Sequence, residues 1–359
     1  MIYIHVPFCR SFCNYCDFYS EIPEEGMFQA YTDAICNEIR QRKDEFDSRL
    51  HTLYFGGGTP TVLPLSSLTR ILMTLQDIGF GAPFDEFTLE GNPEDIVEKG
   101  LPYLTSLRSL GVDRLSIGVQ SFDDEMLRWM NRRHNAERAE KAFRLAREAG
   151  FRNISLDLIF GISNLADDVW SATVDKVIEL SPEHVSCYQL SVEGDNVLAR
   201  MEEEGRYREA DDDKCARQYE ILCRKLGDAG FHHYEISNFA KPGFEARHNG
   251  GYWARLPYVG LGPSAHSFRD PVRSWNSPAL TSYTASSEVL SDEDRMVETV
   301  MLALRTDKGI DGNYLRAHAD PADVDAMVKA GGLVLMEGGR YRIPEESFFR
   351  SDAIIRELI

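Results

Sequence analysis

The sequence predicts an α/β protein whose core is a parallel sheet of six strands, either open or curled into a partial barrel. Two observations lead to this fold class. Short runs of β-branched or aromatic residues recur about every 30 residues through the first two-thirds of the chain, and amphipathic helical stretches lie between them. Functional groups of such sheets gather at the C-terminal ends of the strands, and the polar motifs of this chain directly follow the predicted strands.

Each βα unit can be assigned from its own pattern. The six strands are expected at residues 2–8, 52–55, 86–90, 114–119, 154–160 and 184–190. Amphipathic spacing predicts the helices between them, of which the clearest span residues 28–43, 65–78 and 136–149. Gly150 follows the last of these helices, at the position where a glycine commonly ends a helix.

The pattern changes after residue 190, and three regions are expected. Residues 1–240 form the βα sheet, residues 241–286 form a connecting segment rich in glycine and proline, and residues 287–359 form a small α+β domain. The last region is predicted to hold two or three short helices and then a hairpin that turns at Gly338 and Gly339, an arrangement that resembles a winged helix. Winged helices often bind DNA, but this region holds 15 acidic and 9 basic residues, so a lid or a platform for a partner is favoured.

The charge of the chain argues against a nucleic-acid partner. With 39 Lys and Arg against 58 Asp and Glu, the formal net charge is −19, whereas binding to phosphates gains from an excess of cations. No apolar run approaches the ~20 residues that span a bilayer, and the N-terminal apolar stretch is too short for a signal peptide. A cytoplasmic protein is therefore expected.

Seven cysteines, an odd number in a chain expected to be cytoplasmic, favour metal or redox chemistry over disulfides. Cys9, Cys13 and Cys16 follow the first strand on one loop, so they can surround a single inorganic centre. Three thiolates can bind a [4Fe–4S] cube and leave one iron open. A structural zinc site completed by His5 or by a distant cysteine is the alternative. The remaining four cysteines are expected to pack as small apolar side chains: Cys36, Cys187, Cys215 and Cys223.

The cysteine triplet and its flanks resemble a known superfamily. The spacing of the three cysteines is similar to that of radical S-adenosylmethionine proteins, and the run from His5 to Phe18 resembles the branch with oxygen-independent coproporphyrinogen III oxidases and HemW-type haem chaperones. The resemblance extends over nearly the whole chain. It implies a partial (β/α)6 barrel of the TIM type and a [4Fe–4S] cluster. It also implies that S-adenosylmethionine binds the open iron, where its cleavage gives a 5′-deoxyadenosyl radical.

Residues after the second and third strands match positions that contact S-adenosylmethionine in this superfamily. Gly57, Gly58 and Thr59 follow the second strand, and the resemblance implies that they lie against the methionine part of the cofactor. Glu90 ends the third strand and matches an acid near the methionine ammonium, which is a favourable charge pair. The alternatives are a strand-ending turn for the glycines and a solvent-facing cap for Glu90.

Four further positions are implied as cofactor contacts. Gln120, at the end of the fourth strand, matches a residue on the ribose, and Arg132 matches one on the methionine carboxylate. Asp157 lies within an apolar strand, where a buried carboxylate needs a partner, and the resemblance implies that the ribose hydroxyls lie there. Tyr3 matches a tyrosine before the cysteine loop, with core packing as its alternative.

Two features separate the members of this branch. The oxidases typically carry a fourth cysteine two residues after the third, and Phe18 stands at that position here. The segment from Arg247 to Trp253 matches the haem-chaperone pattern H-N-x-x-Y-W, in which His248 is the predicted ligand of haem iron. Arg247 and Arg255 are candidates to hold the haem propionates. A turn is the alternative for this segment, because Asn-Gly-Gly has strong turn chemistry.

The chain is therefore predicted to be a radical S-adenosylmethionine haem chaperone, which binds haem and transfers it to acceptor haemoproteins. Expected partners are haem and haem-accepting proteins, with membrane-associated haemoproteins among the candidates, and a second copy of the chain in a homodimer. The alternative is an oxygen-independent coproporphyrinogen III oxidase of porphyrin biosynthesis, an enzyme of the coproporphyrinogen dehydrogenase type. A radical enzyme that acts on tRNA is disfavoured by the acidic charge.

Overall fold

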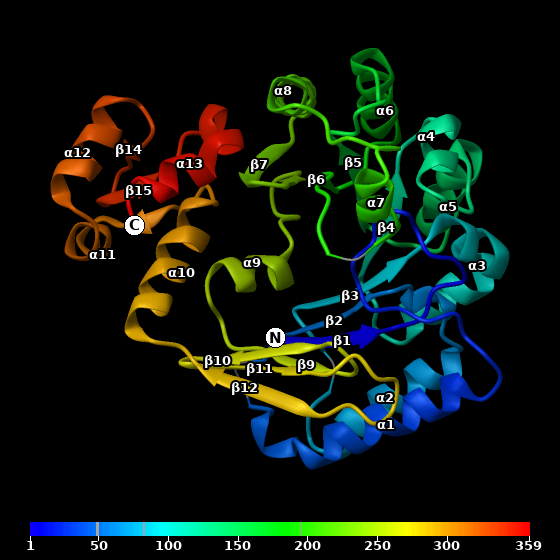
Figure 1. Ribbon diagram of the computed structural model, residues 1–359. Coiled ribbons are helices and arrows are strands. Elements are labelled where there is room, and N and C mark those ends of the chain that lie inside the picture. Colours follow the sequence, from blue (N-terminus) through cyan, green and yellow to red (C-terminus); the bar gives the residue numbers. More distant parts are fainter. Residues whose placement is uncertain (48–49, 82, 195) are drawn as a thin grey trace.

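The computed structural model describes residues 1–47, 50–81, 83–194 and 196–359. Within them, six parallel strands lie side by side in the order of the sequence and form the centre of a nine-stranded sheet. They are β1 (Ile2–Val6), β2 (Thr52–Gly57), β3 (Glu86–Gly91), β4 (Arg114–Gln120), β5 (Asn153–Phe160) and β6 (His184–Gln189). The sheet is curved (Figure 1), so the predicted partial barrel is confirmed.

Helices connect the strands and cover the outer side of the sheet (Figure 1). They are α1 (Met27–Gln41), α2 (Leu65–Asp77), α3 (Pro93–Ser109), α4 (Asp124–Trp129), α5 (Ala136–Glu148), α6 (Asp167–Leu180) and α8 (Asp212–Asp228). Buried positions three to four residues apart, such as Tyr31, Ile35 and Ile39 of α1, give each helix one face toward the sheet. The helices predicted from spacing begin and end within two residues of α1, α2 and α5. Among the described residues, no helix combines the length and the apolar character needed to cross a bilayer.

Helix α7 (Val197–Glu203) and the short 3₁₀ turns of the described residues do not belong to this outer layer. α7 contacts the cysteine loop instead, where the Leu198 N–H donates to the Asn14 carbonyl at 2.9 Å. The 3₁₀ turns span Lys43–Glu45, Pro60–Val62 and Glu345–Arg350.

The predicted connecting segment, residues 241–286, contributes to the sheet. Its strand β9 (Val259–Leu261) adds a parallel strand beside β1. On the other edge of the sheet, the last residues of the predicted first region form β8 (Asn238–Ala240), which pairs antiparallel with β6, and β7 (His232–Glu235), which pairs with β8. A three-stranded antiparallel sheet follows, made of β10 (His266–Arg269), β11 (Val272–Asn276) and β12 (Ala285–Val289). The predicted boundary after residue 286 therefore falls inside β12. A three-residue strand such as β9 is too short to show a period, so it could not be predicted from the sequence pattern.

The C-terminal region has the order of elements expected for a winged helix. α10 (Asp292–Leu304), β13 (Ile310–Asp311), α11 (Gly312–His318) and α12 (Pro321–Lys329) precede the hairpin of β14 (Val334–Leu335) and β15 (Arg340–Arg342), and α13 (Ser351–Arg356) follows. β15 lies between β13 and β14. His233 of β7 links this region to the barrel, because its ring lies 3.3 Å from a Glu345 carboxylate oxygen and packs edge-on against Phe348.

Helix α9 (Arg247–Trp253) lies inside the curve of the sheet, at the end where the strands begin (Figure 1). The Glu86 carboxylate, on the first residue of β3, accepts the Arg247 and His248 N–H groups at 2.8 and 3.1 Å. An acid at this position favours a helix N-terminus. A Cβ on Gly251 would clash with the Met1 side chain. The Glu86 contacts offset the low helix propensity of Asn-Gly-Gly, and the close approach of Met1 leaves room only for glycine at position 251. The segment is a helix, so the turn alternative is wrong.

Candidate functional site

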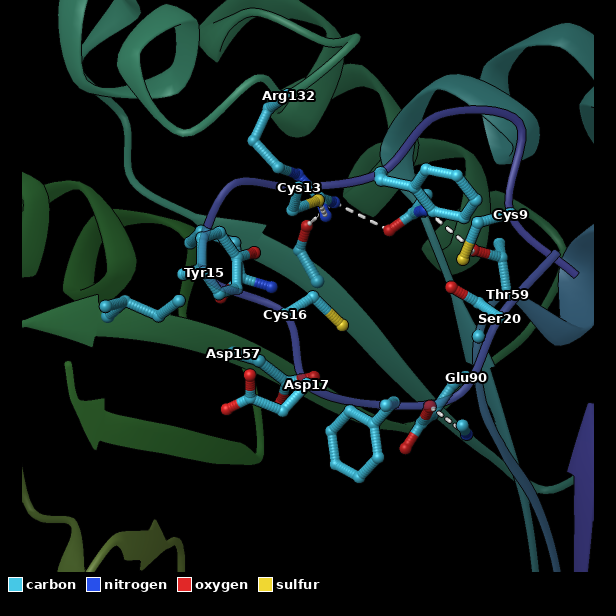
Figure 2. Close-up of a pocket in the computed structure, with 18 of the residues that line it drawn as sticks. Cys9, Cys13, Tyr15, Cys16, Asp17, Ser20, Thr59, Glu90, Arg132 and Asp157 are labelled. Carbon is cyan, nitrogen blue, oxygen red and sulfur yellow. Dashed lines mark hydrogen bonds between the residues drawn. The ribbon is translucent and has the colours of Figure 1, made fainter. Parts of the chain in front are cut away.

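A pocket of about 790 Å³ opens where the six parallel strands end, and its volume lies in the range of small-molecule sites. The predicted site residues that line it are Cys9, Cys13, Cys16, Gly57, Gly58, Thr59, Glu90, Gln120, Arg132 and Asp157. Tyr3 and His248 are not among the residues that line it. Figure 2 shows side chains from several strand ends and from the cysteine loop turned toward this common space.

The cysteine loop is held in place by backbone contacts to β2 and by its own closure. The Cys9 N–H donates to the Glu21 carbonyl at 3.0 Å, and the Gly58 N–H donates to the Val6 carbonyl at 2.8 Å. Gly57 has a φ of +102°, and a Cβ there would clash with the His5 ring. A Cβ on Gly58 would lie 2.8 Å from the Val6 carbonyl oxygen. These glycines therefore let the end of β2 lie close to the end of β1, from which the cysteine loop starts, whatever ligand they also contact.

The thiols of Cys9, Cys13 and Cys16 lie around the same space in the pocket (Figure 2). Arg132 donates from Nη1 to Cys13 Sγ at 3.3 Å, and Cys9 Sγ lies 3.5 Å from the Thr59 hydroxyl. Burial raises the pKa of the Cys16 thiol to about 11, so its thiolate needs a positive partner. In the described part of the chain, no group of His, Cys, Asp or Glu side chains converges on a single metal ion. A cube distributes its cysteines over three irons, so three thiols around one space can serve as its donor set.

Arg132 and Gln120 project from the β4 end of the pocket. Arg132 Nη2 donates to the Asn92 amide oxygen and to the Gly118 carbonyl, both at 2.6 Å. Burial acts to lower the pKa of Arg132, but the nearby Tyr15, Cys13 and Glu94 outweigh it and raise the pKa above its usual range. Gln120 ends β4 at a bulge with a φ of +65°. Left-handed backbone at a residue other than glycine is strained, and such strain is frequent at functional sites.

Glu90 and Asp157 bring two buried carboxylates to the pocket. Glu90 accepts from the Tyr54 hydroxyl at 2.6 Å and from the Gly57 N–H at 3.1 Å. Burial nevertheless raises the pKa of Glu90 to about 7. Asp157 accepts from the Ser116 hydroxyl at 2.9 Å and from the Ser155 hydroxyl at 3.1 Å, and burial raises its pKa as well. Both acids are therefore placed where a cation or a hydroxyl donor from a ligand would stabilise them.

Tyr3 and His248 lie deeper in the barrel than the pocket lining. The Tyr3 hydroxyl lies 3.1 Å from His5 Nδ1. His248 is 1% exposed, and both of its ring nitrogens are engaged, Nδ1 with the Thr52 hydroxyl at 2.8 Å and Nε2 with the Tyr252 hydroxyl at 2.9 Å. Coordination of iron by His248 would therefore require at least one of these hydrogen bonds to break.

The two arginines predicted to hold the haem propionates, Arg247 and Arg255, differ in their surroundings. Arg247 is exposed. Arg255 already pairs with Glu298 at 2.7 Å and with Asp270 at 3.2 Å.

The structure adds residues to the site that the sequence did not single out. Asn92 joins two predicted residues, because its amide donates to Thr59 at 3.0 Å and accepts from Arg132. An asparagine between glycine and proline directly after a strand is a signal that could have found it. Exposed apolar side chains also line the pocket: Phe12 (48% exposed), Phe18 (65%), Tyr188 (45%) and Val197 (45%). Only the fold brings these four together.

The residues of the pocket fit the cofactors that the sequence implied. Three thiols on one loop are the donor set for a cluster with one open iron. Arg132 Nε is buried without a hydrogen-bond partner in the described structure, and a ligand carboxylate would satisfy it. Glu90 can accept an ammonium group, and Asp157 can accept hydroxyl groups. Cluster and S-adenosylmethionine together thus match the charges that the pocket presents.

Comparisons with known proteins agree with this geometry. Residues 3–177 match the model of the radical SAM superfamily. The chain is 33% identical to the heme chaperone HemW of Synechocystis over 86% of this chain and 78% of that protein. It is also 33% identical to the heme chaperone HemW of Mycobacterium tuberculosis over 100% and 94%, respectively. Among solved structures, the coproporphyrinogen III oxidase HemN of Escherichia coli matches with a TM-score of 0.81 at 21% identity, over 99% of this chain and 89% of that one.

Proposed function

Because this chain belongs to the HemW family of the radical SAM superfamily, we propose that it binds haem and transfers it to haem-accepting proteins. Membership of the superfamily also implies a [4Fe–4S] cluster and S-adenosylmethionine as cofactors. The likeness to the coproporphyrinogen III oxidase shows a shared fold and no more, because the two chains are only 21% identical. Oxidation of coproporphyrinogen III, the alternative raised by the sequence, stays the second candidate function.

The observation that carries the proposal is the side chain at the position of the missing fourth cysteine. Phe18 is 65% exposed at the pocket, together with the exposed side chains of Phe12, Tyr188 and Val197; we call these four residues the apolar rim. An exposed apolar patch of this kind marks an interaction site, and a flat apolar macrocycle can stack on its aromatic rings. A thiol at position 18 would instead offer a metal ligand or a redox group. We propose that haem contacts the apolar rim.

The residues of the pocket would hold the two cofactors as follows. Cys9, Cys13 and Cys16 would bind the cluster, which supplies one-electron chemistry together with S-adenosylmethionine when both are bound. Glu90 would accept the cofactor ammonium, Arg132 its carboxylate, and the remaining contacts would come from Gly57, Gly58, Thr59, Gln120, Asp157 and, from the barrel interior, Tyr3. In the proposed function, the occupied pocket controls haem release or dimerisation of the chain.

In addition to the apolar rim, His248 stays a predicted contact of haem, as a ligand of its iron. Its two hydrogen bonds give the prediction a clear cost, because iron coordination removes at least one buried hydrogen bond of the barrel interior. The acceptors, including membrane-associated haemoproteins, and the homodimer likewise stay predictions.

Haem titration followed by absorbance tests the proposal. We expect Phe18→Ala to weaken haem binding about 3- to 10-fold, because it removes an aromatic contact surface worth roughly 1 kcal/mol. Leu335→Ala is the matched control, since Leu335 is 61% exposed on the C-terminal region and away from the pocket. Equal affinities of the two variants would contradict the placement of haem at the rim.

A second assay separates the two candidate functions. The reconstituted protein is incubated with reductant, S-adenosylmethionine and coproporphyrinogen III. The chaperone proposal predicts no stoichiometric formation of protoporphyrinogen IX, and formation of that product would establish the oxidase instead.

A further inference from the structure

Helix α9 and the first residues of β2 and β3 form a closed set of contacts beneath the pocket. The His248 ring lies between the Thr52 and Tyr252 hydroxyls, and Glu86 caps the helix. Burial is the main reason that the pKa of His248 is lowered to about 3, so the ring stays neutral at any working pH. A neutral imidazole with both nitrogens hydrogen-bonded is fixed in its orientation, so a side chain that packs against it is fixed as well.

The neighbour that His248 holds is Tyr54. The two ring centroids lie 5.0 Å apart with a tilt of 36°, and the Tyr54 hydroxyl reaches the Glu90 carboxylate at 2.6 Å. The glycine before Gly57 makes room for this contact: a Cβ on Gly56 would lie 2.7 Å from the Tyr54 ring and 2.9 Å from Glu90 Oε1. A chain of contacts therefore runs from α9 through Tyr54 to a carboxylate of the cofactor pocket.

Other charged and titratable groups also face Glu90. Asp157 on β5 acts to raise its pKa, and Arg114 on β4 acts to lower it, but both act less strongly than burial. Three phenols other than that of Tyr54 interact with it electrostatically: Tyr3 on β1, Tyr188 on β6 and Tyr252 on α9. Among all these groups, Tyr54 is the side chain that donates a hydrogen bond to the Glu90 carboxylate in the described structure.

We propose that Tyr54 is a positioning residue for S-adenosylmethionine: it holds the Glu90 carboxylate in the orientation that receives the cofactor ammonium, and His248 holds the Tyr54 ring. The inference goes beyond haem transfer, because it assigns the H-N-x-x-Y-W helix to the cofactor site. It depends on the pocket and not on where haem binds, so it can fail while the proposed function stands.

The first test is the affinity of the cluster-reconstituted protein for S-adenosylmethionine, measured by equilibrium dialysis without reductant between pH 6 and 8.5. Glu90 must be ionised to pair with the ammonium, so the affinity of the wild-type protein weakens as the pH falls below about 7. Tyr54→Phe removes a donor that favours the ionised form. We therefore expect weaker binding, by about 3- to 10-fold at pH 7.5, and a pH midpoint raised by roughly half a unit or more.

The control is Tyr103→Phe, which removes the hydroxyl of another buried tyrosine, on α3. Its affinity and pH midpoint should match those of the wild-type protein. If Tyr54 were only a packing residue, Tyr54→Phe would leave the pH midpoint unchanged because the ring is kept, and that result would overturn the proposal.

The second test uses His248→Ala and titrates the same preparation with S-adenosylmethionine and with haem. Positioning predicts that His248→Ala weakens the cofactor as Tyr54→Phe does, and that the double variant is little weaker than either single one, since the two residues act in one chain. Loss of haem affinity with unchanged cofactor affinity would overturn the positioning of Tyr54 by His248 and support iron ligation. If His248→Ala does not fold, the isosteric Tyr54→Phe still decides the proposal.

Discussion

The cysteine loop and helix α9 both carry side chains able to bind a metal, but they differ in how much of that bonding capacity is already used. In the loop, the backbone makes the structural contacts, and the thiols of Cys9, Cys13 and Cys16 face a pocket. In α9, the side chain of His248 makes the structural contacts itself, with both nitrogens engaged. A binding motif is thus better judged by the capacity that its side chains leave open than by their chemical type.

The largest expected effect concerns the loop. Anaerobic purification should give about four irons per chain, and Cys13→Ala should lose nearly all of them, because two thiolates cannot hold the cube. Iron content is measured by a colorimetric assay. Cys36→Ala is the control, since Cys36 is buried in α1 among apolar residues. A Cys13→Ala protein that keeps its iron would show that the thiol is not a ligand.

The next effect separates ligand binding from stability within the pocket. Asp157→Asn should weaken S-adenosylmethionine about 10-fold, because it removes a charged acceptor for the ribose hydroxyls. Its free energy of unfolding should not fall. Burial raises the pKa of Asp157 in the folded protein, so the folded state loses stability relative to the unfolded chain as the pH rises above the pKa of this acid in the unfolded chain, and asparagine avoids that loss. Dialysis and urea unfolding at pH 7.5 give the two values, and a variant that binds normally but unfolds easily would reverse the assignment.

Much of the pocket could be predicted because its residues follow strands, and strands show a period. Cys9, Glu90, Gln120 and Asp157 belong to βα units whose apolar runs are visible in the sequence. The family resemblance then supplied the ligands. The apolar rim could not be predicted, since Phe12 and Phe18 of the loop meet Tyr188 of β6 and Val197 of α7 only through the closure of the barrel.

Helix α9 shows why the local sequence alone suggested the wrong backbone conformation for residues 247–253. Asn-Gly-Gly favours a turn, yet the Glu86 carboxylate, distant in sequence, accepts the N–H groups at the start of this segment, which is a helix. His248 stays a predicted haem ligand, but the buried setting of its ring could not be seen from the local sequence. The partners that engage its nitrogens are Thr52, far away on β2, and Tyr252, whose helical position was not expected.

A smaller effect tests whether α9 is held by the contacts assigned to it. Thr52→Val removes the hydroxyl at His248 Nδ1 and leaves a buried nitrogen without its partner, so we expect a loss of about 1–3 kcal/mol in the free energy of unfolding. Thr74→Val in α2 is the matched control, because within the described residues that hydroxyl bonds only to the Arg70 carbonyl of its own helix, and its loss should cost less. Urea unfolding measures both. Equal costs would mean that the Thr52 contact adds nothing beyond an ordinary buried hydroxyl.

The smallest expected effect returns to the apolar rim. Because Phe18 is 65% exposed, Phe18→Ala should change the free energy of unfolding by less than about 0.5 kcal/mol. The same substitution at Phe55, which is fully buried in β2, should cost about 3–5 kcal/mol. If Phe18→Ala proved as costly as a core substitution, the rim would be part of the packing that supports the cysteine loop, and its weaker haem binding would follow from unfolding. A stable Phe18→Ala protein with weakened haem binding would instead show that the exposed ring is kept for a partner and not for the fold.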